Sequence, residues 1–588
     1  MKQLVTILFC TVVLFATAYA QKDIVAVDSD MFGEGNLNNA IQEKIDAGTL
    51  SNTIFQLEPY GYYIIIGPII VPQGDMLEIT APDPGTTQQT SLPQIVWTAS
   101  GGVNKDFLID SYGDLTIKNV WFRYADVGGV QVGSTIMMQD DPVANASGKG
   151  EVAYFEGCVF DYSPCPGNAG GAVGVGAKHF KGTFKNCHFR NCIDTHLRYY
   201  GRALSFPYQT TLWHNDYVLF ENCTFANMGY VYMQEAPEYG DNVHFNHCTF
   251  VNVIMHSLES GFWYNMSTTN CLFFNTYMYG DIPAQRGEDD YNGGTARIDS
   301  IANFGFEVPF TEQDRHILFT NNSYFLEQWL LDWMYDNPYS AEKRRNREED
   351  LVPVPQPMLS PGTLVFFDTT DAITGQKLFP YMNKANLYEE IDPGFVNAPT
   401  NIDSLKDFLW RKWSTNTDAN WSWNPESGLN QEWPLPEDLS YTNETLKTAA
   451  MGGFPLGDLF HWWPNEYAQW QAQSVGEWAN ILDMLENGLT SVQKLPGSSV
   501  PSQFALNQNY PNPFNPTTQI KYSVPTTDHV SLKVYNSIGQ EVATLFDGVQ
   551  NAGNYVVTFD GTGLAGGIYF YQLQSESVMI TKKLVLMK

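Results

Sequence analysis

The chain is poor in basic residues and in charge overall. It carries 32 Lys and Arg against 64 Asp and Glu among 588 residues, and its formal net charge is −32 at pH 7. Proteins that bind nucleic acid need clustered Lys and Arg to displace counterions, so the composition argues against that class. Aromatic residues make up 14% of the chain, which excludes the aromatic-poor disordered class. The composition therefore indicates an ordered, acidic chain, and its length is large for a single compact domain.

Long apolar runs are also scarce, and the one that stands out is at the start of the chain. The run Leu4–Phe15 follows Lys2 and precedes the small residues Ala18 and Ala20, the pattern of a secretory signal peptide cleaved after Ala20. It is short for a membrane anchor, and the later run Tyr62–Val71 is only the length of a strand. We therefore expect residues 1–20 to be a signal peptide and the mature chain to have no transmembrane segment.

Cysteine is scarce too, but its positions reveal a repeat. One of the eight cysteines lies in the signal peptide, and the remaining seven are too few for a disulfide scaffold. Five of them recur within similar strings that contain aromatic residues and asparagine. The strings are FEGCVFDY from Phe155, FKNCHFRN from Phe184, FENCTFAN from Phe220, FNHCTFVN from Phe245 and TTNCLFFN from Thr268, with relatives that lack cysteine from Ile117 and Phe319.

The spacing of the copies indicates the architecture. The tightest steps between equivalent cysteines run from Cys223 to Cys248 and from Cys248 to Cys271. Steps of roughly this length, about two dozen positions, suit one coil of a parallel β-helix, in which coils stack about 4.8 Å apart. The residue patterns of leucine-rich repeats and propeller blades are absent. We predict an all-β chain with a parallel β-helix over residues 21–340, begun by a short helical cover at residues 36–48.

Stacked coils place equivalent residues in columns. The five repeat cysteines are predicted to be buried thiols, because neighbouring Cβ atoms in such a stack lie farther apart than the roughly 3.8 Å of a disulfide. A metal cluster is the alternative, but thiolates spread one per coil do not form a tetrahedral site. Cys165 and Cys192 lie off this column and could pair with each other. The asparagines that end the copies are expected to form a second ladder at a bend: Asn191, Asn227, Asn252 and Asn275.

The repeat is lost after residue 340, and tryptophan becomes abundant. Nine tryptophans lie between residues 392 and 488: Trp410, Trp413, Trp421, Trp423, Trp433, Trp462, Trp463, Trp470 and Trp478. Large aromatics can cover the open end of a β-helix, or they can form platforms for sugar rings. We interpret residues 341–490 as a helical, aromatic C-terminal cap and keep the sugar platform as the alternative. Residues 491–503 are rich in small residues and are predicted to be a linker.

The chain changes character again from Phe504 to its end. This segment contains YPNPFNP from Tyr510, VYNSIGQEV from Val534, AGGIYFYQL from Ala565 and the basic pair Lys582 and Lys583. Alternating strands between Gly, Asn and Pro turns predict a small β-sandwich. In these motifs and in their order, residues 504–588 resemble the type A C-terminal sorting domain of type IX secretion substrates. The resemblance implies an Ig-like sandwich, interaction with the type IX secretion machinery, and release from or attachment to the surface of a Gram-negative bacterium.

Residues 25–340 resemble the right-handed parallel β-helix proteins of the pectate-lyase-like superfamily in fold. Counting seven residues on from the ladder asparagines aligns Gln234 with Glu259 and suggests one polar face. Its side chains could serve glycoside hydrolysis or elimination from uronic acids, or they could form a solvated row of ion pairs. The signature strings of pectate lyases and polygalacturonases are missing. The candidate catalytic residues are His196, Arg198, Glu235, Glu259 and Asp281.

The loop from Gly287 to Thr295 is the one candidate cation site. Asp289, Asp290 and Asn292 offer oxygen ligands for calcium, although the loop lacks the twelve-residue pattern of a helix-loop-helix site. No nucleophile elbow, phosphate-binding loop or His-Glu-x-x-His motif is present. Calcium is therefore the single cofactor that the sequence suggests.

The charge is unevenly placed along the chain. Residues 504–588 contain five Lys against five Asp and Glu, so the mature charge of −33, after loss of Lys2, belongs to the passenger and linker. An acidic passenger repels polyanionic chains, which favours neutral glycans or protein partners. Two hypotheses follow: a secreted or surface protein that binds and perhaps cleaves polysaccharide, or a non-catalytic adhesion or structural protein.

Overall fold

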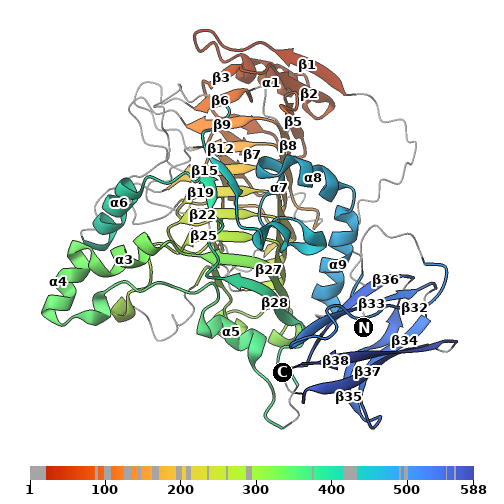
Figure 1. The fold of residues 1–588 in the computed structure, drawn as a ribbon. Coiled ribbons are helices and arrows are strands. Elements are labelled where there is room, and N and C mark those ends of the chain that lie inside the picture. Colours follow the sequence, from red (N-terminus) through yellow and green to blue (C-terminus); the bar gives the residue numbers. More distant parts are fainter. Residues whose placement is uncertain are drawn as a thin grey trace.

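The fold is described from a computed structural model. It covers residues 22–85, 91–97, 107–124, 134–141, 148–161, 171–193, 201–206, 214–234, 238–259, 262–285, 294–373, 376–414, 433–488, 492–494, 501–526, 528–550, 552–561, 564–575 and 577–587. The described strands between residues 22 and 325 are arranged in successive coils, and each pairs in parallel with its counterpart in the next coil. Figure 1 shows the coils stacked as a column. The prediction of a parallel β-helix is confirmed.

Three parallel sheets make up the sides of this column. The first contains β1 (Asp23–Val27), β2 (Thr53–Leu57), β5 (Met76–Thr80), β8 (Asp114–Lys118), β11 (Val152–Glu156), β14 (Lys181–Lys185), β17 (His214–Asn215), β18 (Tyr217–Glu221), β21 (Tyr239–Asn246) and β24 (Trp263–Thr269). The second contains β3 (Tyr62–Ile65), β6 (Gln94–Trp97), β9 (Trp121–Tyr124), β12 (Val159–Asp161), β15 (His188–Cys192), β19 (Thr224–Met228), β22 (Thr249–Val253) and β25 (Leu272–Thr276). The long strands β27 (His316–Phe325) and β28 (Met382–Glu389) run through both sheets. The third contains β4 (Ile69–Val71), β7 (Ile109–Ser111), β10 (Ile136–Met138), β13 (Val173–Val175), β16 (Leu204–Ser205), β20 (Tyr232–Met233), β23 (Leu258–Glu259) and β26 (Ala296–Arg297).

Stacked phenylalanines fill the interior because the repeat places one at the same register position of each coil. On the first sheet, ring centroids of successive phenylalanines lie 4.5–5.1 Å apart over Phe155, Phe184, Phe220 and Phe245. On the second sheet they lie 4.4–5.2 Å apart over Phe122, Phe160, Phe189, Phe225, Phe250 and Phe273. These near-parallel offset contacts come in addition to the burial of large apolar surfaces.

The cysteine column and the asparagine ladder are both as predicted. Cys158, Cys187, Cys223, Cys248 and Cys271 are fully buried and form no disulfide. Burial raises the pKa of Cys187 and Cys248 because it disfavours the thiolate. Along the ladder Asn191, Asn227, Asn252 and Asn275, each asparagine after the first donates its side-chain amide to the one before it, with Nδ2···Oδ1 distances of 3.2–3.3 Å. All four have positive φ, which asparagine tolerates better than most residues. Cys165 lies outside the described residues, so the suggested pair with Cys192 stays a prediction.

The open ends of the column are covered by different elements. At the start, α1 (Asn36–Asp46) lies over the first coil with Leu37 and Ile41 buried, as predicted for residues 36–48. At the far end, Phe366 and Phe367 of α5 (Pro361–Asp368) join the central core. Helices α3 (Gln328–Asp336), α4 (Pro338–Asn346) and α6 (Ile402–Ser414) pack together at one side. Single turns of 3-10 helix occur at η1 (Leu50–Asn52), η2 (Pro283–Gln285), η3 (Ile301–Asn303), η4 (Glu312–Asp314), η5 (Glu349–Leu351), η7 (Leu446–Thr448) and η8 (Met451–Gly453).

The described tryptophans of the predicted cap lie along the flank of the column and not over its end. Residues 433–488 contain β30 (Asp438–Tyr441), which pairs with β29 (Phe395–Asn397), and the helices α7 (Leu459–Trp462), α8 (Pro464–Gln471) and α9 (Ser474–Asn487). Figure 1 shows α8 and α9 beside the stacked strands. This segment docks on outward asparagines of the repeat turns. Asn186 donates to the Tyr467 hydroxyl (3.0 Å), and Asn270 accepts from the backbone N–H of Met451 (2.9 Å).

The C-terminal part is an antiparallel β-sandwich, as predicted. One sheet has the order β31 (Val492–Lys494), β36 (Gly553–Asp560), β33 (Thr517–Val524), β32 (Ala505–Leu506). The other has the order β35 (Glu541–Gln550), β34 (Asp528–Asn536), β37 (Gly567–Gln574), β38 (Met579–Leu586). Residues 492–494 of the predicted linker thus form an edge strand of the sandwich. Within the described part of the chain, no helix has both the length and the apolar character needed to cross a membrane.

Candidate functional site

Most of the predicted catalytic and calcium-binding residues lie outside the described part of the chain. This applies to His196, Arg198 and Glu235 of the predicted polar face, and to Asp289, Asp290 and Asn292 of the predicted calcium loop. The catalytic and calcium-binding roles of these residues stay predictions.

The two described members of the polar face, Glu259 and Asp281, belong to different elements. Glu259 lies in β23, where it pairs with Met233 and not with Gln234, so the predicted alignment is shifted by one residue. Its carboxylate is nearly buried and lies 3.2 Å from Nη1 of Arg297. Asp281 follows β25 and forms a backbone bridge with Val354. The strand that continues the sheet beside Glu259 is β26, so the structure places an arginine where the alignment expected residues near 281.

A buried polar network joins the second sheet to the flanking segment. Arg190 of β15 lies 3.1 Å from Asp161 and 2.9 Å from Oε1 of Glu437. Burial raises the pKa of Glu437, although the charge of Arg190 works in the opposite direction. Burial also lowers the pKa of His188, whose ring lies close to that of His461. These groups are covered from solvent, and their contacts attach the flank to the column.

An open pocket of about 560 Å³ lies in the flank, between the segment from η7 to Pro455 and α8. We call it the Trp463 pocket. Trp463 lines it with a half-buried indole that also packs edge-on against Tyr441, at 5.0 Å between centroids. Phe454 adds a second aromatic ring. The remaining side chains include the polar groups Lys447, Glu466, Gln469 and Gln473. An aromatic wall with a few polar groups is the usual composition of a site for a small ligand.

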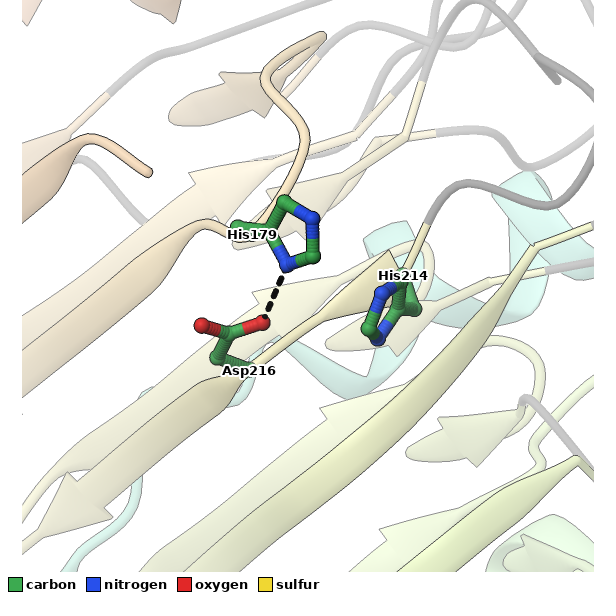
Figure 2. Close-up of side chains that lie close together, drawn as sticks. All are labelled: His179, His214 and Asp216. Atoms are coloured by element: carbon green, nitrogen blue, oxygen red, sulfur yellow. Dashed lines mark hydrogen bonds and ion pairs between the residues drawn. The ribbon is translucent and has the colours of Figure 1, made fainter. Parts of the chain in front are cut away.

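A histidine and carboxylate cluster lies at the N-terminal ends of β14 and β18 in the first sheet. Among the described residues, His179, His214 and Asp216 form the one group whose potential metal-ligand atoms all lie within 4.8 Å of one another. Figure 2 shows the imidazole of His179 bonded to Asp216, with His214 beside them. Burial of His214 opposes its charged form, but the hydrogen bond and charge of Asp241 outweigh this effect and raise the pKa of His214.

The sequence offered weak signals for these two sites. Trp463 is one of nine tryptophans, and nothing in its neighbourhood distinguishes it from those that pack. His179 and His214 precede the first phenylalanine of consecutive copies by five and six residues, in HFKGTFKN and HNDYVLFEN. A search for polar residues at a near-constant distance before each copy would have found them. The predicted polar face rests instead on residues that follow the copies.

Comparison with known families agrees with both halves of this architecture. Residues 106–290 match the family model of the right handed β-helix region, and residues 508–587 match that of the secretion system C-terminal sorting domain. Searches of curated proteins and of solved structures find no match to the chain. The protein is therefore a type IX secretion substrate that is exported to the cell surface or the extracellular space. Its tail interacts with the secretion machinery, and its passenger is a right-handed β-helix.

Proposed function

We propose that the exported passenger binds a neutral polysaccharide at the Trp463 pocket. The observation that carries this proposal is the half-buried indole of Trp463 in an open pocket that also contains Glu466, Gln469 and Gln473. The C–H face of a pyranose is apolar and packs against the electron-rich face of an aromatic ring. The amide and carboxylate groups around the ring supply hydrogen bonds to sugar hydroxyls.

The charge of the passenger supports a neutral ligand. All of the mature net charge of −33 lies outside residues 504–588. Approach of a polyuronate or a sulfated glycan is opposed at long range by this field. A chain of neutral hexoses has no such penalty and still presents both a C–H face and hydroxyl groups.

The pocket supports binding and not cleavage. Glycoside hydrolysis generally uses two carboxylates, one on each side of the scissile bond. Of the described residues that line the pocket, Glu466 is the one with a carboxylate. The function supported best is therefore that of a glycan-binding surface protein.

A glycan array probed with the mature chain tests the proposal, followed by calorimetry with the best neutral oligosaccharide. We expect Trp463→Ala to lower the affinity at least about tenfold, equivalent to about 1.4 kcal/mol, and Trp463→Phe to retain most of it. Trp329→Ala, in a separate hydrophobic cluster on α3, is the matched control and should bind like the wild type. An array without neutral glycan hits, or binding that survives Trp463→Ala, would refute the proposal.

A further inference from the structure

We propose that His179, His214 and Asp216 form a binding site for one divalent transition-metal ion of the zinc class. The three residues come from two successive coils of the β-helix. His179 lies two residues before β14, His214 lies in β17, and Asp216 joins β17 to β18. Stacking brings together residues that are 37 positions apart in the chain. Figure 2 shows their side chains gathered on the same side of the strands.

The backbone around this cluster is fixed by hydrogen bonds between coils. The N–H of His179 donates to the carbonyl of His214 (3.0 Å), and the N–H of Asp216 donates to the carbonyl of Phe180 (3.0 Å). Gly150 lies so close to His179 that a Cβ atom there would be 1.9 Å from the His179 carbonyl oxygen. A rigid backbone of this kind preorganises ligands on separate coils, which lowers the cost of bringing them together on a metal.

The side chains have the contacts expected around metal ligands. Nδ1 of His214 lies 2.8 Å from Oδ2 of Asp241, which fixes the ring and leaves Nε2 as the nitrogen for a metal. Lys181 lies 2.8 Å from Oδ2 of Asp216, so the metal would take the other oxygen, Oδ1. Metal-binding histidines and carboxylates are typically held by partners of this kind, so Asp241 and Lys181 are positioning residues.

The geometry needs only a small adjustment to accept an ion. Nδ1 of His179 and Oδ1 of Asp216 lie 2.8 Å apart, at hydrogen-bond distance. Two ligands of a tetrahedral zinc ion, each at about 2.0 Å, are about 3.3 Å apart. Binding of a metal in place of this hydrogen bond therefore requires these two atoms to separate by about 0.5 Å. The ligand nitrogen of His214 lies within 4.8 Å of both and has to approach them by at most about 1.5 Å. The fourth coordination position would be left to water.

The ligand set and the surroundings select the class of ion. Two imidazoles and one carboxylate suit zinc, copper or nickel, whereas calcium prefers oxygen ligands alone. The side chains of His179, His214 and Asp216 keep between 22% and 29% of their exposure, so an ion can reach them from solvent. The acidic passenger attracts cations at long range. This site shares no residue with the Trp463 pocket or with the predicted calcium loop.

Equilibrium dialysis of the mature full-length chain against Zn²⁺, after treatment with a chelator, tests the site. We expect His214→Ala and Asp216→Asn each to lower the affinity for one zinc ion by at least about 100-fold, and Asp241→Asn to lower it by about 10- to 100-fold. His316→Ala is the matched control, because His316 lies on the same outer side of the same sheet, in β27, and should leave zinc binding unchanged. Substitution with Co²⁺ should give the visible absorption of a tetrahedral site, and His214→Ala should abolish it.

Thermal melts accompany the binding measurements to show that each variant is folded. If a ligand variant fails to fold, Asp241→Asn decides the question, because Asp241 acts through the orientation of His214. The absence of saturable zinc binding, or zinc binding that His214→Ala, Asp216→Asn and Asp241→Asn leave unchanged, would show that the cluster is only a hydrogen-bonded row.

Discussion

The passenger and the C-terminal sandwich are both built from strands, but they gain stability in different ways. In the passenger, parallel strands pair with their counterparts in the next coil, and like residues stack on like residues. In the sandwich, antiparallel strands alternate buried and exposed residues around one small core. Residues 21–503 carry a formal net charge of −33, whereas residues 504–588 are neutral. The sorting domain is therefore a compact unit with its own core, whereas the passenger is a series of coils that each pack on their neighbours.

The same comparison predicts how far the effect of a destabilising substitution extends in each part. A coil contacts chiefly the coils on either side, so a defect in one coil weakens the column locally. The two sheets of the sandwich share one core, so a defect there affects the whole unit. Four predictions test this division, from the largest expected effect to the smallest.

Deleting residues 504–588 should abolish export and leave the folding of the passenger intact. We expect the truncated passenger to fold and to accumulate in the periplasm, because the sorting domain is the part that interacts with the secretion machinery. Immunoblots of periplasmic, surface and medium fractions measure this result. As the reciprocal control, residues 492–588 attached to an exported reporter should send the reporter across the outer membrane. Surface display of the truncated passenger would show that residues 504–588 are not required for export.

Phe225→Ala tests the aromatic column of the passenger. Phe225 is fully buried, and its ring stacks on Phe189 at 5.2 Å and on Phe250 at 5.0 Å. Removal of the ring leaves a cavity, which should lower the free energy of unfolding of the passenger by about 3–5 kcal/mol. Differential scanning calorimetry of the mature chain should show that only the passenger transition moves to lower temperature. An equal shift of the sandwich transition would mean that the two parts unfold as one unit.

Asn252→Ala tests the asparagine ladder. Its amide donates to Asn227 (3.2 Å) and Thr400 (2.9 Å), and its φ is 56°. Loss of these bonds and the strain of alanine at positive φ should together lower the free energy of unfolding by about 2–4 kcal/mol. Asn252→Gly removes the strain and should recover about 1 kcal/mol of this loss. Asn265→Ala, on the half-buried outer side of β24, should cost less than about 1 kcal/mol in the same denaturant titration.

Glu151→Gln tests a buried carboxyl of the passenger. Burial, together with the nearby Asp140 and Asp141, raises the pKa of Glu151 to about 7. The folded state therefore holds a proton that the unfolded state has released, so this contribution to stability is complete below pH 4.5 and is lost as pH rises through 7. The melting temperature of the wild type should fall more between pH 5 and pH 8 than that of the variant. Parallel profiles for the two proteins would contradict the assignment.

The repeat made much of the fold predictable. The cysteine column and the asparagine ladder follow from patterns that recur at a short period, because stacking turns each recurring position into a column. The cover by residues 36–48 follows from a single local helical pattern that ends in glycine. The polar face was harder to predict because Glu259 lies beyond connections of unequal length. Its partner in the next coil is Arg297, which lies farther along the chain than one tight step of the repeat. A one-residue error in such an alignment also moves a side chain to the opposite face of the sheet.

The sequence by itself determined that the chain is a stack of coils with a secretion tag, because these features depend on residues that repeat or that form contiguous motifs. Tertiary structure decided where the tryptophans lie and which polar groups meet. The flank docks on outward asparagines such as Asn186 and Asn270, whose partners have no periodicity of their own. His179 and Asp216 meet because two coils stack in one particular register. Such contacts join distant parts of the chain, and their geometry is fixed only when the whole column has formed.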